Sequence, residues 1–407
     1  MTGPELNTGE LRPIATERLR RVGRPHRLLR PENAGAKARR RWPSGLLGML
    51  ALVAAAETSV ARRWSVVTEP VAFSWRFSAR AAAEDAPGCS LLCLGDSLAK
   101  HGLVPSVIEG VTGRRTYNLA AAAAPAPLTY FLFKRALDAG AKPDAVLLEL
   151  KPGLLAGGPR YRLRDWPEVL SPAETLELSL SARSGAFAAE LLLGEALPTF
   201  RARHDLRDNL LAALRGETAR PRDINAVCRR NWTVNFGANV ARPRPAFDGL
   251  VSEAQHRDLL SHRFALHKVN ARYVRRALDL AAARGIRVYL VIPPLPPAVL
   301  TRRGQSGAEA KFNEYVRSLQ SIYPGLTVLD ARTSGYGHEV FVDPSHLDVR
   351  GAFTLSADVA DALRADLDSR PVAGRWVDLP AYRPMPAAVA LEDVEQSRER
   401  LGIPWRP

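Results

Sequence analysis

The chain is poor in cysteine, with three such residues in 407: Cys89, Cys93 and Cys228. Cys89 and Cys93 fall within one apolar run, and nothing pairs with them to complete a four-ligand set at metal-binding spacing. This excludes a cysteine-based metal site, and we expect neither a metal nor another cofactor. We expect Cys93 to be a buried, small apolar side chain. A disulfide from Cys228 to one of the other two is the alternative in an oxidising compartment.

Near its N-terminus the chain lacks an uninterrupted apolar run of the ~20 residues that span a bilayer as a helix. The run at 45–56 has 12 residues, and accepting Glu57 in the headgroup region extends it to Ala61. The preceding residues, 1–43, hold 11 Lys and Arg against 4 Asp and Glu. This basic leader favours a single membrane helix at 44–63, with the leader in the cytoplasm and the rest of the chain outside it. A signal peptide cleaved after Ala56, giving a secreted protein, and a cytosolic helix packed on the domain are the alternatives.

The chain also lacks basic motifs interleaved with aromatic residues, the pattern typical of nucleic-acid binding. Its formal net charge is +15, but almost half of this excess lies in the basic leader. The remainder is only mildly basic, so we expect no nucleic-acid partner.

Short runs of β-branched residues and leucine alternate with helical stretches after residue 89. This alternation predicts an α/β fold with a parallel sheet and crossover helices. We expect five strands, at 90–94, 115–119, 144–150, 286–292 and 326–329. We expect helices at 97–111, 128–139, 252–284, 308–323 and 346–367.

The periodicity weakens in the middle of the chain, over a stretch too long for a connecting loop, which predicts an inserted and mostly helical cap. The expected parts are the leader 1–43, the signal-anchor or signal peptide 44–63, the first part of the α/β domain 64–154, the cap 155–264, the second part of the domain 265–370, and a Pro-rich surface tail 371–407.

Polar residues follow the first expected strand, in the tripeptide Gly95-Asp96-Ser97. Ligands of an open parallel sheet bind beyond the carboxyl ends of its strands. A serine there has its hydroxyl at a helix N-terminus, where backbone N–H groups favour developing negative charge. Ser97 is therefore a candidate nucleophile. The alternative is that Ser97 and Asp96 only cap the helix.

A second polar segment, Asp343-Pro344-Ser345-His346, precedes the last expected helix. An aspartate three residues before a histidine in such a loop lets both side chains reach the same edge of the sheet. Asp343 would orient His346, and His346 would take the proton from Ser97, as in a catalytic triad.

These two motifs resemble those of the SGNH/GDSL hydrolases, over residues 89–154 and about 265–368. The resemblance implies a flavodoxin-like, three-layer α/β/α sandwich in which Ser97 attacks an ester carbonyl, His346 is the general base and Asp343 orients its ring. The segment from Arg115 to Ala120, with the Ala/Pro loop after it, is similar to planctomycete-type, membrane-anchored members. A looser similarity connects the chain to members that transfer acyl groups onto cell-envelope polysaccharides.

The sequence departs from this family in the oxyanion hole. The family uses the serine N–H, a glycine N–H after the second strand and an asparagine side chain after the third, whereas this chain has alanines at 120–124 and Lys151-Pro152-Gly153. We expect the N–H groups of Ser97 and of the Ala122 region to act as donors. Lys151 and Asn118 are candidate substitutes for the missing asparagine. The alternatives are a solvated lysine and a strand asparagine bonded to neighbouring backbone.

Further polar residues fall close to the expected site or in the cap. We expect His101, one turn after Ser97, to be structural or to line the substrate site. In the cap, Arg229, Arg230, Asn231 and Trp232 are candidates for contacting a sugar or an anionic polymer, the alternative being a polar surface with a buried tryptophan.

The expected function is that of a membrane-tethered serine esterase or acyltransferase acting on an O-acyl ester, carried by an extracytoplasmic carbohydrate. The alternative is a catalytically inactive SGNH-fold subunit that binds carbohydrate or serves in assembly of the cell envelope, motivated by the missing asparagine.

Overall fold

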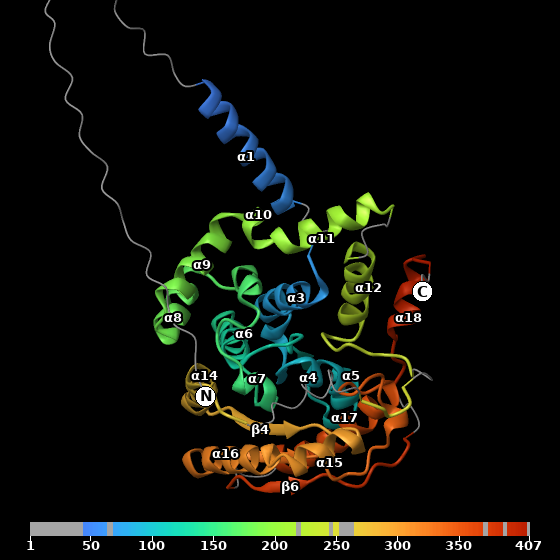
Figure 1. Ribbon diagram of the computed structural model, residues 1–407. Helices are drawn as coiled ribbons and strands as arrows, with labels where there is room; N and C mark the ends of the chain where they lie inside the picture. The colour runs from blue at the N-terminus through green and yellow to red at the C-terminus, as the bar shows by residue number, and fades with distance from the viewer. Residues whose placement is uncertain are drawn as a thin grey trace, which may run out of the picture. The chain divides into compact units, whose positions relative to one another are not determined.

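The computed structural model describes residues 44–62, 68–216, 221–243, 247–251, 264–368, 373–385 and 389–404. The chain divides into two units, Met1–Leu50 and Ala51–Pro407. In the first, the described residues are the opening turns of helix α1 (Ser44–Arg62). The second is an α/β unit built around one parallel sheet (Figure 1).

The sheet has six strands in the order β2-β1-β3-β4-β5-β6, and every neighbouring pair is parallel. The strands are β1 (Leu91–Leu94), β2 (Thr116–Asn118), β3 (Ala145–Glu149), β4 (Arg287–Ile292), β5 (Thr327–Asp330) and β6 (Trp376–Asp378). The first five lie within a residue or two of their expected positions. The expectation of five strands was wrong by one, because β6 is a three-residue edge strand within the Pro-rich tail.

Helices cover both faces of the sheet, so the unit is a three-layer α/β/α sandwich. Alternate residues of β1 face opposite sides: Leu92 and Leu94 belong to one core, and Leu91 and Cys93 to the other. The first core includes residues of α3 (Pro70–Glu84), α6 (Ala126–Asp138), α14 (Lys268–Ala283) and α16 (Ala308–Ile322). The second includes residues of α4 (Ser97–Gly102), α5 (Pro105–Thr112) and α17 (Val349–Leu367). The predicted fold class, a three-layer α/β/α sandwich, is thus confirmed.

Three expected helices differ from the observed ones. The helix expected at 97–111 is two helices, α4 and α5, because the chain turns extended at Leu103 and Val104 before Pro105. The helix expected from residue 252 begins at Lys268, where the His267 side chain caps it; residues 252–263 lie outside the described part. The last helix begins at Val349 rather than His346, because Asp348 caps its first turn.

The region expected to form the cap is mostly helical where it is described. It contains α7 (Pro152–Ala156), η2 (Leu163–Glu168), α8 (Pro172–Ala182), α9 (Gly185–Ala196), α10 (Pro198–Arg201), α11 (Arg203–Leu214) and α12 (Pro221–Val234). In Figure 1, α8 to α11 lie on the side of the unit opposite β4 and β6.

The segment after α12 packs against the sheet edge. The N–H of Asn118 in β2 donates to the carbonyl of Phe236 over 2.9 Å, which satisfies an edge amide of the sheet. Gly237 follows with a φ of +92°, and a Cβ there would lie 2.0 Å from the Asn118 carbonyl oxygen. Only glycine fits this close approach.

The tail forms part of the fold and does not simply lie on the surface as expected. After β6 it forms α18 (Val394–Arg400), and its residue Glu392 binds α12. The Glu392 carboxylate accepts from Arg230 at 2.7 and 2.8 Å, while its carbonyl accepts from Asn231 and Asn235, each at 2.8 Å. The chain end therefore holds the segment that covers the β2 edge.

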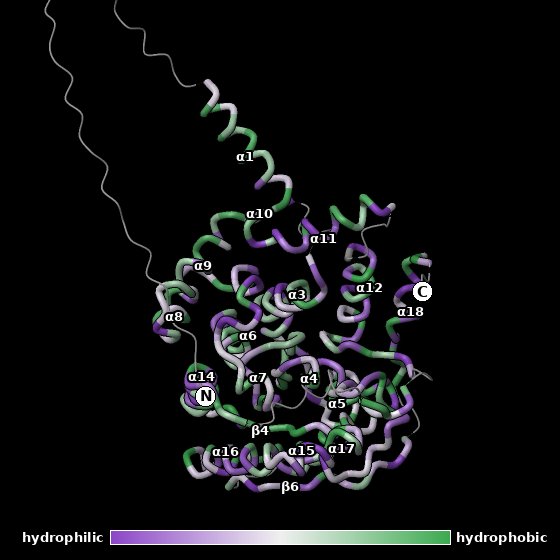
Figure 2. Tube along the Cα trace, in the orientation of Figure 1, coloured by the Kyte–Doolittle hydropathy of each residue, from purple (hydrophilic) through white to green (hydrophobic). Residues whose placement is uncertain are grey.

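Helix α1 has no buried residue. It has 19 residues and is long and apolar enough to cross a membrane. Its hydropathy is shown in Figure 2, where apolar residues recur along the helix.

The three cysteines are free, so the disulfide alternative was wrong. Cys93 is buried as expected, and burial raises the pKa of its thiol.

Candidate active site

Ser97, His346 and Asp343 lie in contact at the carboxyl edge of the sheet. His346 Nε2 is 2.8 Å from Ser97 Oγ, and His346 Nδ1 is 2.8 and 3.0 Å from the two Asp343 carboxylate oxygens. Both ring nitrogens therefore have a partner, one a hydroxyl and the other a carboxylate. This is the arrangement of nucleophile, base and orienting acid that a triad requires.

The loop before α17 positions Asp343 and His346. Asp343 Oδ1 accepts the backbone N–H groups of Ser345 and His346, at 2.8 and 3.0 Å, which fixes the turn between acid and base. The N–H of Val342 donates to the His346 carbonyl over 2.9 Å and closes the loop. The Asp343 orientation is thus set by its own backbone as well as by the imidazole.

The electrostatics of Asp343 favour its charged form. Burial acts to raise the pKa of this carboxyl, but the hydrogen bond and charge of His346 and the two backbone N–H groups outweigh burial. The pKa of Asp343 is therefore held well below its usual range. An ionised acid at this position stabilises the imidazolium that forms when the histidine takes a proton.

Ser97 is the first residue of α4, and Asp96 is the cap of this helix. Asp96 Oδ1 accepts the N–H of Leu98 over 2.7 Å. The capping alternative therefore applies to Asp96, while the Ser97 hydroxyl is left to face His346. Gly95 before them has a φ of +147°, and a Cβ there would meet Glu149 Oε2 at 2.7 Å.

Glu149, at the end of β3, holds this turn by a hydrogen bond that the sequence did not predict. Its Oε2 accepts the Asp96 N–H over 2.9 Å. Burial, together with the nearby Asp96 carboxyl group, raises the pKa of Glu149 well above its usual range. The other oxygen of each carboxyl, Glu149 Oε1 and Asp96 Oδ2, is buried with no hydrogen-bond partner among the described residues. The two side chains thus form an apposed carboxyl pair beside the turn that carries Ser97.

Lys151 lies beside this pair. Its Nζ is 3.8 Å from Asp96 Oδ2, and its side chain is mostly covered. Lys151 is therefore paired with a carboxylate and only partly open to solvent. Its nearest described charge is the Asp96 carboxylate, so Lys151 places a positive charge next to the residue that precedes Ser97.

Asn118 is fully engaged in structural bonds. Its Nδ2 donates to the carbonyls of Ala99 and Leu103, at 2.9 and 2.8 Å, and its Oδ1 accepts the N–H of Ala120 over 2.9 Å. Its interpretation as an oxyanion donor is corrected accordingly, because both amide hydrogens are used inside the fold.

The alanine loop after β2 is held by helix α3, which sequence reasoning did not connect with the site. The Ala122 N–H donates to Ser74 Oγ over 3.0 Å, so this N–H, expected to be an oxyanion donor, is already engaged. The Trp75 indole donates to the Ala122 carbonyl over 2.7 Å. Carbonyl and N–H point to opposite sides of a trans peptide, so the Ala123 N–H points away from Trp75.

Ala123 adopts the left-handed conformation, with φ 52°, in the turn closed by the Ala124 N–H and the Ala121 carbonyl. This is the conformation that glycine adopts most readily. The Ala121 N–H donates to the Gly95 carbonyl over 3.2 Å, so the loop lies beside the nucleophile turn. The Ala123 N–H therefore replaces that of Ala122 as the second donor candidate. The first is the Ser97 N–H, at a helix position that has no intrahelical acceptor.

His101 lies against the catalytic candidate histidine. The ring centroids of His101 and His346 are 4.4 Å apart. On its other side, Asn239 Nδ2 is 3.0 Å from His101 Nε2, and Asn239 Oδ1 accepts from the Trp232 indole over 2.8 Å. The segment after α12 thus reaches the site through Asn239, whose position in space no sequence pattern indicated.

Three of the four residues expected to contact a sugar are buried or paired within the fold, whereas Arg229 is exposed. Trp232 and Asn231 are buried, and Arg230 is paired with Glu392. Arg229 lies over the ring of Phe73 at 5.4 Å. The alternative of a buried tryptophan is therefore confirmed.

Lys100 connects the alanine loop with the same segment. It is fully buried, and its Nζ donates to the carbonyls of Ala120 and Gly237, at 3.1 and 2.9 Å. The Trp232 ring faces it at 4.3 Å. Burial lowers the pKa of Lys100 to about 7.

The described residues contain no group of three or more His, Cys, Asp or Glu side chains placed to hold a metal ion. No family model and no curated protein matches the chain.

Proposed function

We propose that this chain is a serine hydrolase or acyltransferase of the SGNH type that acts on ester bonds. The observation that carries the proposal is the continuous hydrogen-bonded series from Ser97 Oγ through His346 to Asp343. The Gly-Asp-Ser-Leu and Asp-Pro-Ser-His motifs that resemble the SGNH/GDSL family supply these residues.

The proposed reaction starts when His346 Nε2 takes the proton of the Ser97 hydroxyl as the oxygen attacks the ester carbonyl carbon. The carbonyl oxygen gains negative charge, which the N–H groups of Ser97 and Ala123 would stabilise. The tetrahedral intermediate then expels the alcohol, which receives the proton from His346, and leaves an acyl group on Ser97. Water regenerates the serine in hydrolysis, whereas a second hydroxyl does so in acyl transfer.

We further propose that the catalytic unit is anchored by α1 and lies outside the cytoplasm. The basic leader before a helix of membrane-spanning length supports this orientation. A substrate there would be an O-acylated carbohydrate of the cell envelope, consistent with the looser similarity to acyl-transferring family members.

One observation favours a second candidate, an inactive binding or assembly subunit. The Ala122 N–H and the Asn118 amide, both expected as donors, are committed to Ser74 and to backbone carbonyls. Losing one oxyanion donor typically costs about 10²–10³ in turnover. A site stabilised by too few donors would bind without turning over.

Labelling with a fluorophosphonate probe separates the two candidates. The full chain in detergent is compared with Ser97→Ala, His346→Ala and the control Ser318→Ala, whose serine lies exposed on α16. We expect covalent labelling of the wild type and of the Ser318→Ala control. We expect no labelling of Ser97→Ala or His346→Ala. Labelling that survives in Ser97→Ala contradicts the triad. A folded wild type that is not labelled, as checked by cooperative thermal unfolding, supports the binding subunit.

A further inference from the structure

The helices α8 to α11 carry most of the exposed leucine of the catalytic unit. Outside α1, the exposed leucines among the described residues are Leu176, Leu180, Leu192, Leu193, Leu210, Leu211, Leu214, Leu250 and Leu401. All but the last two lie between Pro172 and Leu214. An apolar group of this kind on a monomer surface marks an interaction site.

Helix α11 is twelve residues long, and none of its residues is buried. Leu210 and Leu214 are 61% and 75% exposed. They lie four residues apart, hence on one side of the helix, and Arg207 precedes Leu210 by three. Figure 2 shows the change along α11 from a hydrophilic start to an apolar end. Exposed leucines with an arginine one turn away supply apolar and cationic groups of the kind that helices in a membrane interface use.

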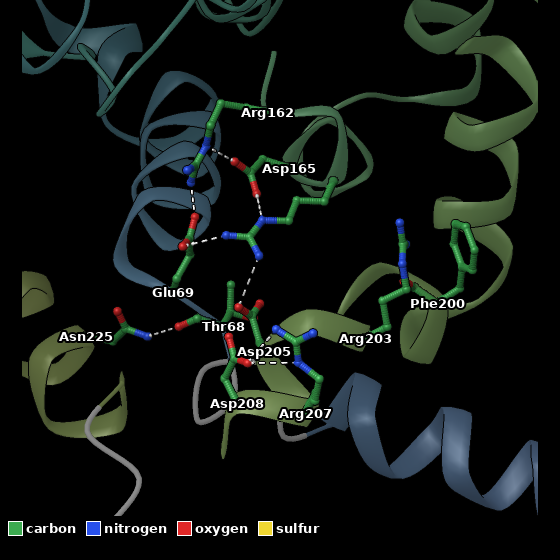
Figure 3. A network of polar contacts seen from close by, with 11 residues as sticks. Thr68, Glu69, Arg162, Asp165, Phe200, Arg203, Asp205, Arg207, Asp208 and Asn225 are labelled. Carbon is green, nitrogen blue, oxygen red and sulfur yellow. Dashed lines mark hydrogen bonds and ion pairs between the residues drawn. The ribbon is translucent and has the colours of Figure 1, made fainter. Parts of the chain in front are cut away.

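The chain enters the catalytic unit beside α11. Thr68 and Glu69, the residues before α3, are held by a polar network that includes Arg162, Asp165, Asp205 and Asn225 (Figure 3). Arg164 contacts Glu69 at 2.5 Å and Asp205 of α11 at 3.4 Å. The entry point is thereby tied to α11.

The connection between α1 and this entry point is short. Seven residues, 63–69, separate the end of α1 from the start of α3. Even fully extended, they span no more than about 25 Å. Glu57 of α1 and Thr199 of α10 both belong to the unit Ala51–Pro407. The Thr199 N–H donates to the Glu57 carboxylate over 2.7 Å, and the Thr199 hydroxyl also donates to this carboxylate. Both the short connection and this contact keep α10 close to the C-terminal end of α1, and α11 follows α10 directly in the chain.

We propose that the exposed leucines of α11, with Arg207 beside them, dock into the surface of the lipid bilayer that α1 crosses. The catalytic unit then rests on the membrane at two places, its transmembrane helix and an interfacial helix. Leu210, Leu211 and Leu214 enter the boundary between headgroups and acyl chains. The Arg207 guanidinium donates from Nε and Nη2 to Asp208 Oδ1, at 3.1 and 3.0 Å, and contacts lipid phosphate with its remaining N–H groups. The proposal rests on the membrane anchoring proposed above and is independent of the serine chemistry.

Fluorescence quenching by lipids tests this docking. The full chain is reconstituted in nanodiscs of phosphatidylethanolamine and phosphatidylglycerol, with Cys228→Ala removing the half-buried thiol. A polarity-sensitive fluorophore is attached through Leu214→Cys, and in the matched control through Ile322→Cys, an apolar residue of α16 that is 56% exposed. Lipids carrying a nitroxide in the upper acyl chain should quench the probe at 214 several-fold more than the probe at 322.

A second variant tests whether the leucines cause the docking. With the probe at Ala213→Cys, an exposed position of α11 that keeps Arg207 in place, replacing Leu210, Leu211 and Leu214 by serine should reduce lipid quenching to that of the 322 control. The replaced side chains are exposed, so folding is unaffected, and alkaline extraction reports separately whether α1 still anchors the chain.

Equal quenching at 214 and 322 overturns the proposal, as does release of the chain by alkaline extraction. A blue-shifted probe at 214 that lipids do not quench also overturns it, because protein, a second copy or a partner, then covers the leucines. Fluorophosphonate labelling of the same nanodiscs reports the serine chemistry independently.

Discussion

The backbone N–H of Asp96 donates to Glu149 Oε2 over 2.9 Å, so the end of β3 supports the turn that carries Ser97. Because burial and Asp96 raise the pKa of Glu149, a neutral carboxyl group is the form that the fold accommodates. Glu149→Gln keeps both the acceptor and a neutral side chain, and we expect its rate of fluorophosphonate labelling to remain within about threefold of wild type. Glu149→Ala leaves the Asp96 N–H without its acceptor. We expect the labelling rate to fall more than about tenfold and the free energy of unfolding to fall by about 1–3 kcal/mol.

The same pair gives a pH dependence of stability with a defined sign. A raised folded-state pKa means that the folded state binds more protons than the unfolded state between the ordinary glutamate pKa and the raised one. The contribution of Glu149 is thus fully present in acid and is lost as pH rises through the folded-state pKa. In urea unfolding measured from pH 4 upward, the free energy of unfolding of the wild type should decline relative to that of Glu149→Gln. Parallel curves for the two proteins contradict a protonated Glu149.

Asp343→Asn tests the orienting role. Its pKa is held low, so the carboxylate is charged throughout an ester assay near neutral pH. The amide cannot stabilise an imidazolium, and its Nδ2 would face the histidine nitrogen that has to donate. We expect turnover of an activated ester to fall by about 10²–10⁴-fold. Asp361→Asn, which removes an exposed carboxylate of α17 paired with Arg364, is the matched control and should leave turnover unchanged.

Lys100 makes a contribution to stability whose pH dependence is opposite to that of Glu149. Burial lowers its folded-state pKa to about 7, whereas an unfolded lysine titrates near 10.4. Between these values the unfolded state binds more protons, so the free energy of unfolding rises with pH. Lys100→Met should lose this rise. Above pH 9 it should also be about 2 kcal/mol less stable than wild type, because the Ala120 and Gly237 carbonyls lose their donor. A slope that persists in the variant would have to come from another group.

Two glycines with positive φ separate two costs of substitution: that of a left-handed backbone and that of a steric collision. Gly113 has a φ of +68° with open space around it, so Gly113→Ala should cost only the left-handed penalty, about 1 kcal/mol. Gly237→Ala adds a collision with the Asn118 backbone, for a total of about 2–4 kcal/mol. Equal losses in chemical denaturation would mean that the segment after α12 is not packed on β2.

Local patterns predicted much of this molecule because its strands are short, apolar and bounded by glycine or proline. The strand before Gly95 and the strand after Gly285 were identifiable in this way, and strand-end placement then predicted where Ser97 belongs. The Asp343–His346 spacing predicted a shared loop, although the loop precedes α17 and does not open it. Strand β6 escaped prediction since three residues at a sheet edge carry no periodicity.

Long-range contacts account for what the sequence could not indicate. Ser74 and Trp75 hold the alanine loop from a helix that precedes the first strand, and Asn239 reaches His101 across 138 positions. No spacing rule connects such residues. Ala122 was the expected donor because the loop position was identified correctly, but the peptide orientation within the loop depends on Trp75.

Glu392 binds the segment that carries Gly237 and Asn239 through Asn231 and Asn235, which lie 161 and 157 positions away in the sequence. Contacts between such distant parts of a chain tend to form late in folding, because closing a long loop costs conformational entropy before the contact is gained. The neighbourhood of Ser97 that includes Asn239 and His101 is therefore complete only once β6 has paired with β5 and Glu392 has reached α12.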